Sequence, residues 1–235
     1  GTVNYYQYMD DRASAGVTPE DNAAIPLLQI VGIDAMYNGG PWAVAVTAAD
    51  VAAKLGVEAS DLAEPRFRWE SFEDYQRRLE LDSAAAAQFR DATLGPWEPE
   101  EYPEVAAWLA EQELALDALV LAYDRPEFYL PGIPEDQTPR MLRVRFPRPG
   151  VFIQLTRALM CRSMLRVQQR ELEDAWSDIL TIQRMGRGLM TQRTSVALLA
   201  GISAEGLALG RTMVLLNDPA LSYAELYRMR SERLG

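Results

Sequence analysis

The sequence predicts an all-α protein, built as a helical bundle or an array of helical hairpins. Apolar residues recur every three to four positions through most of the chain, which is the period of an amphipathic helix. A hydroxyl residue stands three positions before an acid, the spacing of a helix-capping box, at residues 47–50, 71–74 and 222–225. The only sign of a strand is an alternation of apolar residues and arginines, so we expect at most one short strand at 141–146.

In the first half of the chain, start and stop signals delimit short helices. Pro26 should start or kink a helix within residues 21–31, because proline lacks the amide that a helix interior needs. Gly56 and Gly95 each follow a leucine and are predicted to end helices in the left-handed conformation. Pro103 suits the first position of the next helix.

The second half of the chain predicts three long helices, at about 151–170, 172–192 and 195–216, with a fourth starting near Tyr223. The first two form a hairpin whose large and small residues are spaced weakly like those of a tetratricopeptide repeat. Small residues at 197, 201, 204 and 208 follow helical spacing and should let a neighbouring helix approach closely. The segment 195–216 is long enough to span a membrane, but Glu205 at its middle favours a central helix of a soluble bundle.

The two parts of the chain carry opposite charge. Residues 1–139 contain 26 acidic and 8 basic residues, whereas residues 140–235 contain 8 acidic and 15 basic ones. The connection at 126–149 holds six prolines, so we expect an acidic helical region, 1–139, and a basic helical bundle, 140–235. Because opposite fields favour docking, arginines of 140–170 should meet acids of the first part and give one compact unit.

The composition excludes several classes of function. The chain has no histidine, so it cannot build a Ser-His-Asp triad, a Cys-His dyad or a histidine-ligated metal site. Its one cysteine, Cys161, lies in an apolar run and is expected to be an inert core thiol. Nucleotide-binding glycine loops are missing too, so we expect no metal and no cofactor.

Residues 47–64 imitate a helix-turn-helix motif, yet their charge argues against nucleic-acid binding. Four acids oppose Lys54 alone in this segment. DNA binding depends on neutralising phosphates, so an acidic second helix would be repelled.

Two groups of charged residues are candidate binding sites. The first is an arginine group that could bind an anion or a protein partner, or could form a solvated face: Arg143, Arg145, Arg162, Arg166 and Arg170. The second is an acidic group close to three aromatic residues, which could serve a glycan hydrolase or glycan-binding protein: Glu98, Glu100, Glu101 and Glu104. The simpler explanation for these acids is that they complement a helix dipole while the aromatics fill the core.

A buried ion pair is the third expectation. Glu205 and Arg157 each project onto an apolar helix face, and a buried carboxylate needs a partner. We therefore expect a structural Arg157–Glu205 pair, with Arg187 as the alternative partner of Glu205.

Several stretches resemble a large group of uncharacterised planctomycete proteins. They are Gly-Pro-Trp97-Glu-Pro-Glu-Glu-Tyr-Pro103, Arg-Pro-Glu-Phe128-Tyr129-Leu-Pro131, Ala175-Trp176-Ser-Asp-Ile-Leu and 194–206. The resemblance implies a mainly helical domain outside the cytoplasm, with a membrane anchor or signal preceding Gly1; a cytoplasmic location is the alternative. It implies no activity. The sequence thus favours a non-enzymatic interaction or scaffold domain at the cell envelope, with an unidentified protein partner and an oligomeric state that it does not define.

Overall fold

The computed structural model describes residues 4–39, 45–135, 143–192, 194–219, 221, 222, 224 and 227–229. It confirms the all-α prediction. The described elements are helices α1 (Tyr5–Ser14), α2 (Ala24–Val31), α3 (Ala48–Leu55), α4 (Phe72–Arg78), α5 (Ser83–Ala92), α6 (Pro103–Ala122), α7 (Pro149–Gln168), α8 (Leu172–Thr191) and α9 (Ser195–Leu216), the short helical turns η1 (Asp34–Asn38) and η2 (Ala59–Asp61), and strands β1 (Ile133–Pro134) and β2 (Val144–Arg145).

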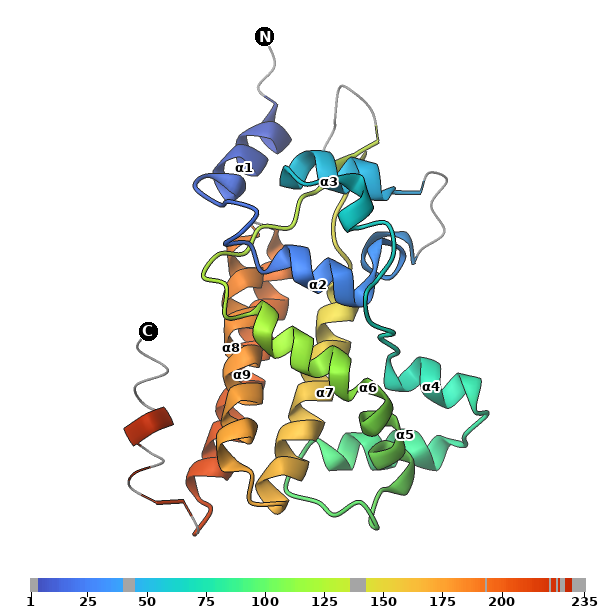
Figure 1. Cartoon of the computed structure of the whole chain (residues 1–235), viewed down its shortest axis with the longest axis vertical. Coiled ribbons are helices and arrows are strands. Elements are labelled where there is room, and N and C mark those ends of the chain that lie inside the picture. Colours follow the sequence, from blue (N-terminus) through green and yellow to red (C-terminus); the bar gives the residue numbers. More distant parts are fainter. Residues whose placement is uncertain are drawn as a thin grey trace.

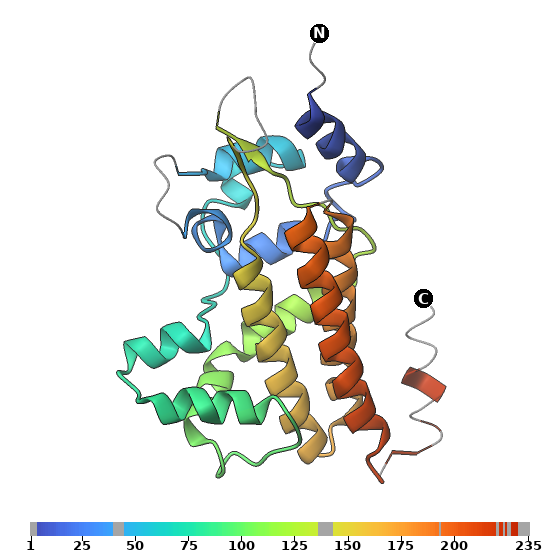
Figure 2. The same cartoon turned by 180° about the vertical axis from the view of Figure 1, so that it is seen from behind.

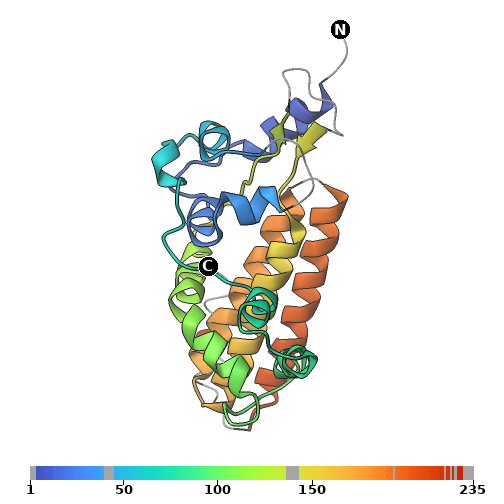
Figure 3. The same cartoon turned by 90° about the vertical axis from the view of Figure 1, so that its right-hand side faces the viewer.

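The three long helices α7, α8 and α9 lie side by side along the long axis of the molecule (Figures 1 and 3). Helices α2 and α6 pack across one side of this array, and α9 lies on the opposite, outer side (Figure 2). The prediction that 195–216 is a central helix is therefore wrong. About a third (33%) of the most apolar stretch of α9 is buried.

A single buried core draws residues from both the acidic and the basic part of the chain. The indole of Trp97 donates a hydrogen bond to the carbonyl of Cys161 in α7 at 3.0 Å, which ties the two parts together. The start of the proline-rich connection is tied down as well, because the side-chain amide of Asn22 bonds both the amide and the carbonyl of Tyr129. The first contact holds the segment between α5 and α6 against α7, and the second holds the start of the connection against the segment before α2.

The predicted strand is confirmed only as a two-residue pair. Val144–Arg145 pairs antiparallel with Ile133–Pro134, with Ile133 opposite Arg145. The first two residues of the predicted strand, 141 and 142, lie outside the described residues.

Most of the predicted helix ends are found. Thr47 and Asp50 form a reciprocal capping box at the start of α3, and Gly56 ends that helix with a left-handed φ of 71°. Pro103 begins α6, and Pro26 lies in the first turn of α2.

One predicted helix end is wrong, and one is only partly described. Helix α5 ends at Ala92 rather than at Gly95, because the Thr93 hydroxyl donates to the carbonyl of Arg90 and closes the last turn. The predicted capping box at 222–225 lies partly outside the described residues.

The small residues of α9 do allow a close helix approach. A Cβ atom added at Gly201 would lie 2.5 Å from the carbonyl oxygen of Gly186, and one added at Gly186 would lie 2.9 Å from the carbonyl oxygen of Gly201. Ala204 and Ala208 are buried on the same face. Backbone contact between α8 and α9 therefore fixes which face of α9 points inward.

Candidate functional site

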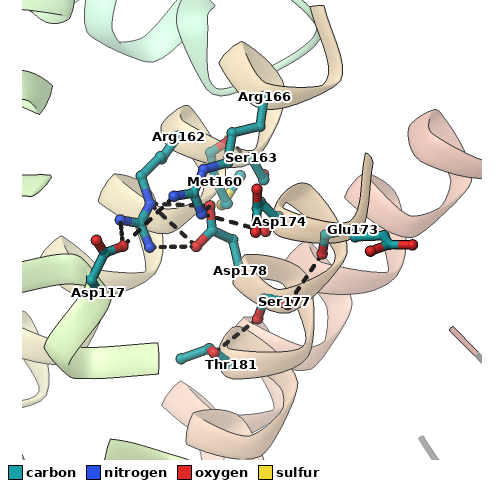
Figure 4. A network of polar contacts seen from close by, with 10 residues as sticks. All are labelled: Asp117, Met160, Arg162, Ser163, Arg166, Glu173, Asp174, Ser177, Asp178 and Thr181. Atoms are coloured by element: carbon teal, nitrogen blue, oxygen red, sulfur yellow. Dashed lines mark hydrogen bonds and ion pairs between the residues drawn. The ribbon is translucent and has the colours of Figure 1, made fainter. Parts of the chain in front are cut away.

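Two of the five candidate arginines, Arg162 and Arg166, meet at one buried carboxylate instead of forming an open binding surface. The guanidinium of Arg162 donates hydrogen bonds to the carboxylate of Asp178 at 2.6–3.2 Å and to that of Asp117 at 2.7 Å. Arg166 donates to the second oxygen of Asp178 at 2.9 Å. Figure 4 shows both guanidinium groups converging on Asp178. This cluster joins α6, α7 and α8.

The burial and charge pairing of this cluster indicate a structural role, in which it holds three helices together. Asp178 is completely buried (0% exposed) and Arg162 nearly so. Burial raises the pKa of the Asp178 carboxyl, while its hydrogen bonds from Arg162 and Arg166 act in the opposite direction. Because the donors of Arg162 are already used by Asp178 and Asp117, that guanidinium is poorly placed to bind an external anion.

The other three arginines lie elsewhere, so the arginine group does not form one surface. Arg145 pairs with Glu135 at 3.3 Å, and the Arg143 carbonyl accepts a hydrogen bond from the Glu135 amide. Arg170 follows the end of α7 in the left-handed conformation (φ 67°) and pairs with Asp218. Helix α7 separates the two locations by its own length of about 30 Å.

The expectation that arginines of 140–170 meet acids of the first part of the chain is confirmed by four ion pairs among the described residues. Arg162 and Arg166 both reach Asp117. Arg145 reaches Glu135, and Arg157 lies 3.4 Å from Glu73.

The predicted Arg157–Glu205 pair is wrong. Arg157 contacts Glu73, with half of its side chain exposed. Glu205 instead pairs at 3.1 Å with Arg187, the alternative partner, and both groups reach solvent. The reason is the orientation of α9: its leucine-rich face, on which Glu205 was placed, points outward.

Two of the four acids beside the aromatics make local hydrogen bonds. The carboxylate of Glu98 accepts a hydrogen bond from Gln168, and the carboxylate of Glu101 accepts one from the Glu98 amide. Trp97 and Trp108 are buried in the core, so their ring faces are not available to a sugar. Two cavities, of about 540 and 550 Å³, are lined by none of the four acids, Glu98, Glu100, Glu101 and Glu104.

The segment that imitated a helix-turn-helix motif lacks a second helix. After α3, residues 59–61 form a single 3₁₀ turn, which is too short to enter a DNA groove.

The main feature that the sequence did not reveal is an exposed apolar face on α9, which we call the α9 face. Its large side chains are each between 39% and 64% exposed. They are Val196, Leu198, Leu199, Ile202, Leu207, Leu209, Met213 and Leu216. Within the described residues, α9 is also the one helix long and apolar enough to cross a membrane by length and composition.

Two cavities of similar size flank the segment after α6. One, of about 550 Å³, is mainly apolar and reaches from Tyr6 to the start of α9. The other, of about 540 Å³, lies between α8, the end of α6 and the turn after α1, and is lined by four arginines. The first and last of these arginines, Arg12 and Arg187, are 175 residues apart in the sequence, so no local motif predicts that they lie together. Among the described residues, no group of three potential metal ligands comes together.

Comparison with known proteins gives no relative. No family model, curated protein or solved structure matches this chain.

Proposed function

We propose that this protein is a non-enzymatic helical interaction domain at the cell envelope, which binds a partner protein through the α9 face. The observation that supports the proposal is the row of eight half-exposed large apolar side chains on one helix. Contiguous apolar patches of this kind mark interaction sites on soluble proteins. The remaining parts of the proposal rest on the sequence: the lack of histidine and the resemblance to the planctomycete group.

A helix of the partner is the occupant that best fits this face. Helix α9 has 22 residues and is about 33 Å long, which suits a second helix laid along it. Gly206 and Gly210 lie on the outer side, and a Cβ at either would meet nothing within 4 Å, so another backbone could approach closely there. A surface of anionic lipid fits less well, because the sole basic residue of α9, Arg211, is buried and donates to the Leu94 carbonyl.

The test compares capture of partners from envelope extract by four proteins, the wild type and three variants. Ile202→Lys and Met213→Lys place charges on the α9 face, and Leu114→Lys places one on α6, at a leucine that is 75% exposed. We expect wild type and Leu114→Lys to capture the same protein and the two α9 variants to lose it. Capture that is equal in all four proteins would contradict the proposal.

Two further measurements identify a different occupant. Light scattering after size exclusion detects a second copy of this chain, and co-sedimentation with vesicles of neutral and anionic lipid detects a membrane. If either association is strong in the wild type and lost in Ile202→Lys, the partner-protein proposal is replaced.

A further inference from the structure

The arginine-lined cavity of about 540 Å³, named here the Tyr123 cavity, contains features that the α9 face does not explain. Tyr123 at the end of α6 and Gln183 on α8 line its buried part. Arg12, Arg125, Arg184 and Arg187 line the same cavity. Its volume falls within the usual range of sites for small molecules, about 300–1,000 Å³.

Two buried polar atoms of this cavity have no hydrogen-bond partner among the described residues. They are the phenol oxygen of Tyr123 and the amide oxygen Oε1 of Gln183, in residues that are 3% and 6% exposed. Leaving such an atom unsatisfied costs about 1–3 kcal/mol, so native proteins retain few of them. Because both atoms line one cavity, a ligand or an ordered water that enters it can supply the missing bonds.

The chemistry of these atoms indicates what that group is. Burial raises the pKa of the Tyr123 phenol, which therefore keeps its proton and can donate as well as accept a hydrogen bond. The Gln183 oxygen can only accept. A hydroxyl group both donates and accepts, so a hydroxylated molecule satisfies both atoms.

The arginines of the cavity indicate that its ligand carries negative charge. Arg184 pairs with Asp124 at 2.8 Å, and Arg187 pairs with Glu205 at 3.1 Å. Arg12, by contrast, donates to the phenol of Tyr8 at 2.9 Å.

Arg125 donates to the carbonyls of Pro19 and Asn22 at 3.0 and 3.1 Å. Within the described residues, Arg12 and Arg125 thus have neutral hydrogen-bond partners and no carboxylate within ion-pair distance. The lining holds four arginines against two acids, Asp124 and Glu127, in a chain whose net charge is −11. Guanidinium groups bind phosphate and carboxylate with two parallel hydrogen bonds, which suits an anion here.

We propose that the Tyr123 cavity binds a small hydroxylated anion, such as a sugar phosphate or a sugar acid. Its phosphate or carboxylate contacts Arg12 and Arg125, and its hydroxyl groups bond Tyr123 and Gln183. This site is separate from the α9 face and does not depend on the function proposed for that face.

The experiment is isothermal titration calorimetry of the whole chain at low salt, with four probes. Glucose 6-phosphate and gluconate carry both parts of the recognised chemistry, whereas glucose lacks the anion and inorganic phosphate lacks the hydroxyl groups. We expect saturable binding of at least one of the first two, at least about tenfold tighter than that of glucose or inorganic phosphate, since one good charged hydrogen bond is worth that factor. Tighter binding of glucose 6-phosphate shows that the site prefers a phosphate, and tighter binding of gluconate shows that it prefers a carboxylate.

Three variants test the residues. Tyr123→Phe removes only the phenol oxygen, and Arg12→Gln removes an exposed charge, so each should weaken binding about tenfold while the circular dichroism spectrum stays that of the wild type. Arg77→Gln is the matched control, because this arginine is 76% exposed and pairs with Asp74 on α4. The proposal is overturned if neither hydroxylated anion binds, if inorganic phosphate binds as tightly as they do, or if Tyr123→Phe binds like the wild type.

Discussion

The close contact between α8 and α9 can be tested by adding a single carbon atom. In Gly201→Ala, the new Cβ would lie 2.5 Å from the Gly186 carbonyl oxygen and 2.6 Å from Cγ of Met190. Non-bonded carbon contacts are favourable at about 3.5–4.0 Å, so α9 must move away from α8 by about 1 Å. Overpacking of this kind costs about 1–3 kcal/mol in the free energy of unfolding.

The matched control is Gly206→Ala on the same helix. Both substitutions replace a glycine in the helix interior, which by itself stabilises a helix by about 1 kcal/mol. At Gly206 nothing lies within 4 Å of the added Cβ, so only this gain applies. The difference between the two variants therefore isolates the steric cost, and Gly206→Ala should be more stable than Gly201→Ala by about 1–3 kcal/mol.

Urea unfolding followed by far-ultraviolet circular dichroism measures this difference as a shift of the midpoint at constant slope. In thermal unfolding, each 1 kcal/mol should appear as about 2–4 °C for a chain of this length. If Gly201→Ala is as stable as Gly206→Ala, then α9 does not meet α8 through Gly201, and the α9 face cannot be the outer face.

Three further outcomes are expected. Asp178→Ala leaves the buried guanidinium of Arg162 without its main partner and should lower the free energy of unfolding by about 3–5 kcal/mol, whereas Asp117→Ala, at a half-exposed carboxylate, should cost at most about 1 kcal/mol in the same urea titration. Glu205→Gln breaks an exposed pair, so a loss above about 1 kcal/mol in urea unfolding would show that this carboxylate is buried. Burial raises the pKa of the Cys161 thiol, so a thiol reagent at neutral pH should label the protein only after unfolding in urea; rapid labelling of the native protein would contradict the buried position.

Many of the helix ends could be predicted because the signals that begin and end a helix are local. Pro103 and the hydroxyl N-caps Thr47 and Ser71 act within one turn of the backbone, so the sequence alone places those helix ends. The predicted spans of α7, α8 and α9 agree with the structure to within two residues at each end.

The partners of the charged side chains could not be predicted in the same way. Both Arg157 and Arg162 lie among apolar residues of α7, and the helix period alone does not say which side meets α6 and α8. The structure turns Arg162 inward to Asp178 and leaves Arg157 half exposed beside Glu73. That choice depends on where α6 lies, which is a tertiary property.

The Tyr123 cavity was beyond the reach of sequence analysis for the same reason. Its lining comes from the α1 region, the end of α6 and α8, and each contributes several residues of ordinary type. An unsatisfied phenol or amide oxygen becomes visible only when the surrounding atoms are in place.

The orientation of α9 shows how two sequence signals can conflict. Its leucines favour one face as the buried face, and its small residues at 201, 204 and 208 favour the other. The structure follows the small residues, because Gly201 lets the backbones of α8 and α9 touch and so brings many side chains into contact at once. Once that face is buried, the leucines on the opposite side of the helix point outward. Eight large apolar side chains on one helix bear a solvation cost when they face water, and burying them against a partner helix removes it. The same glycine contact that organises the core therefore creates the surface through which we propose the protein acts.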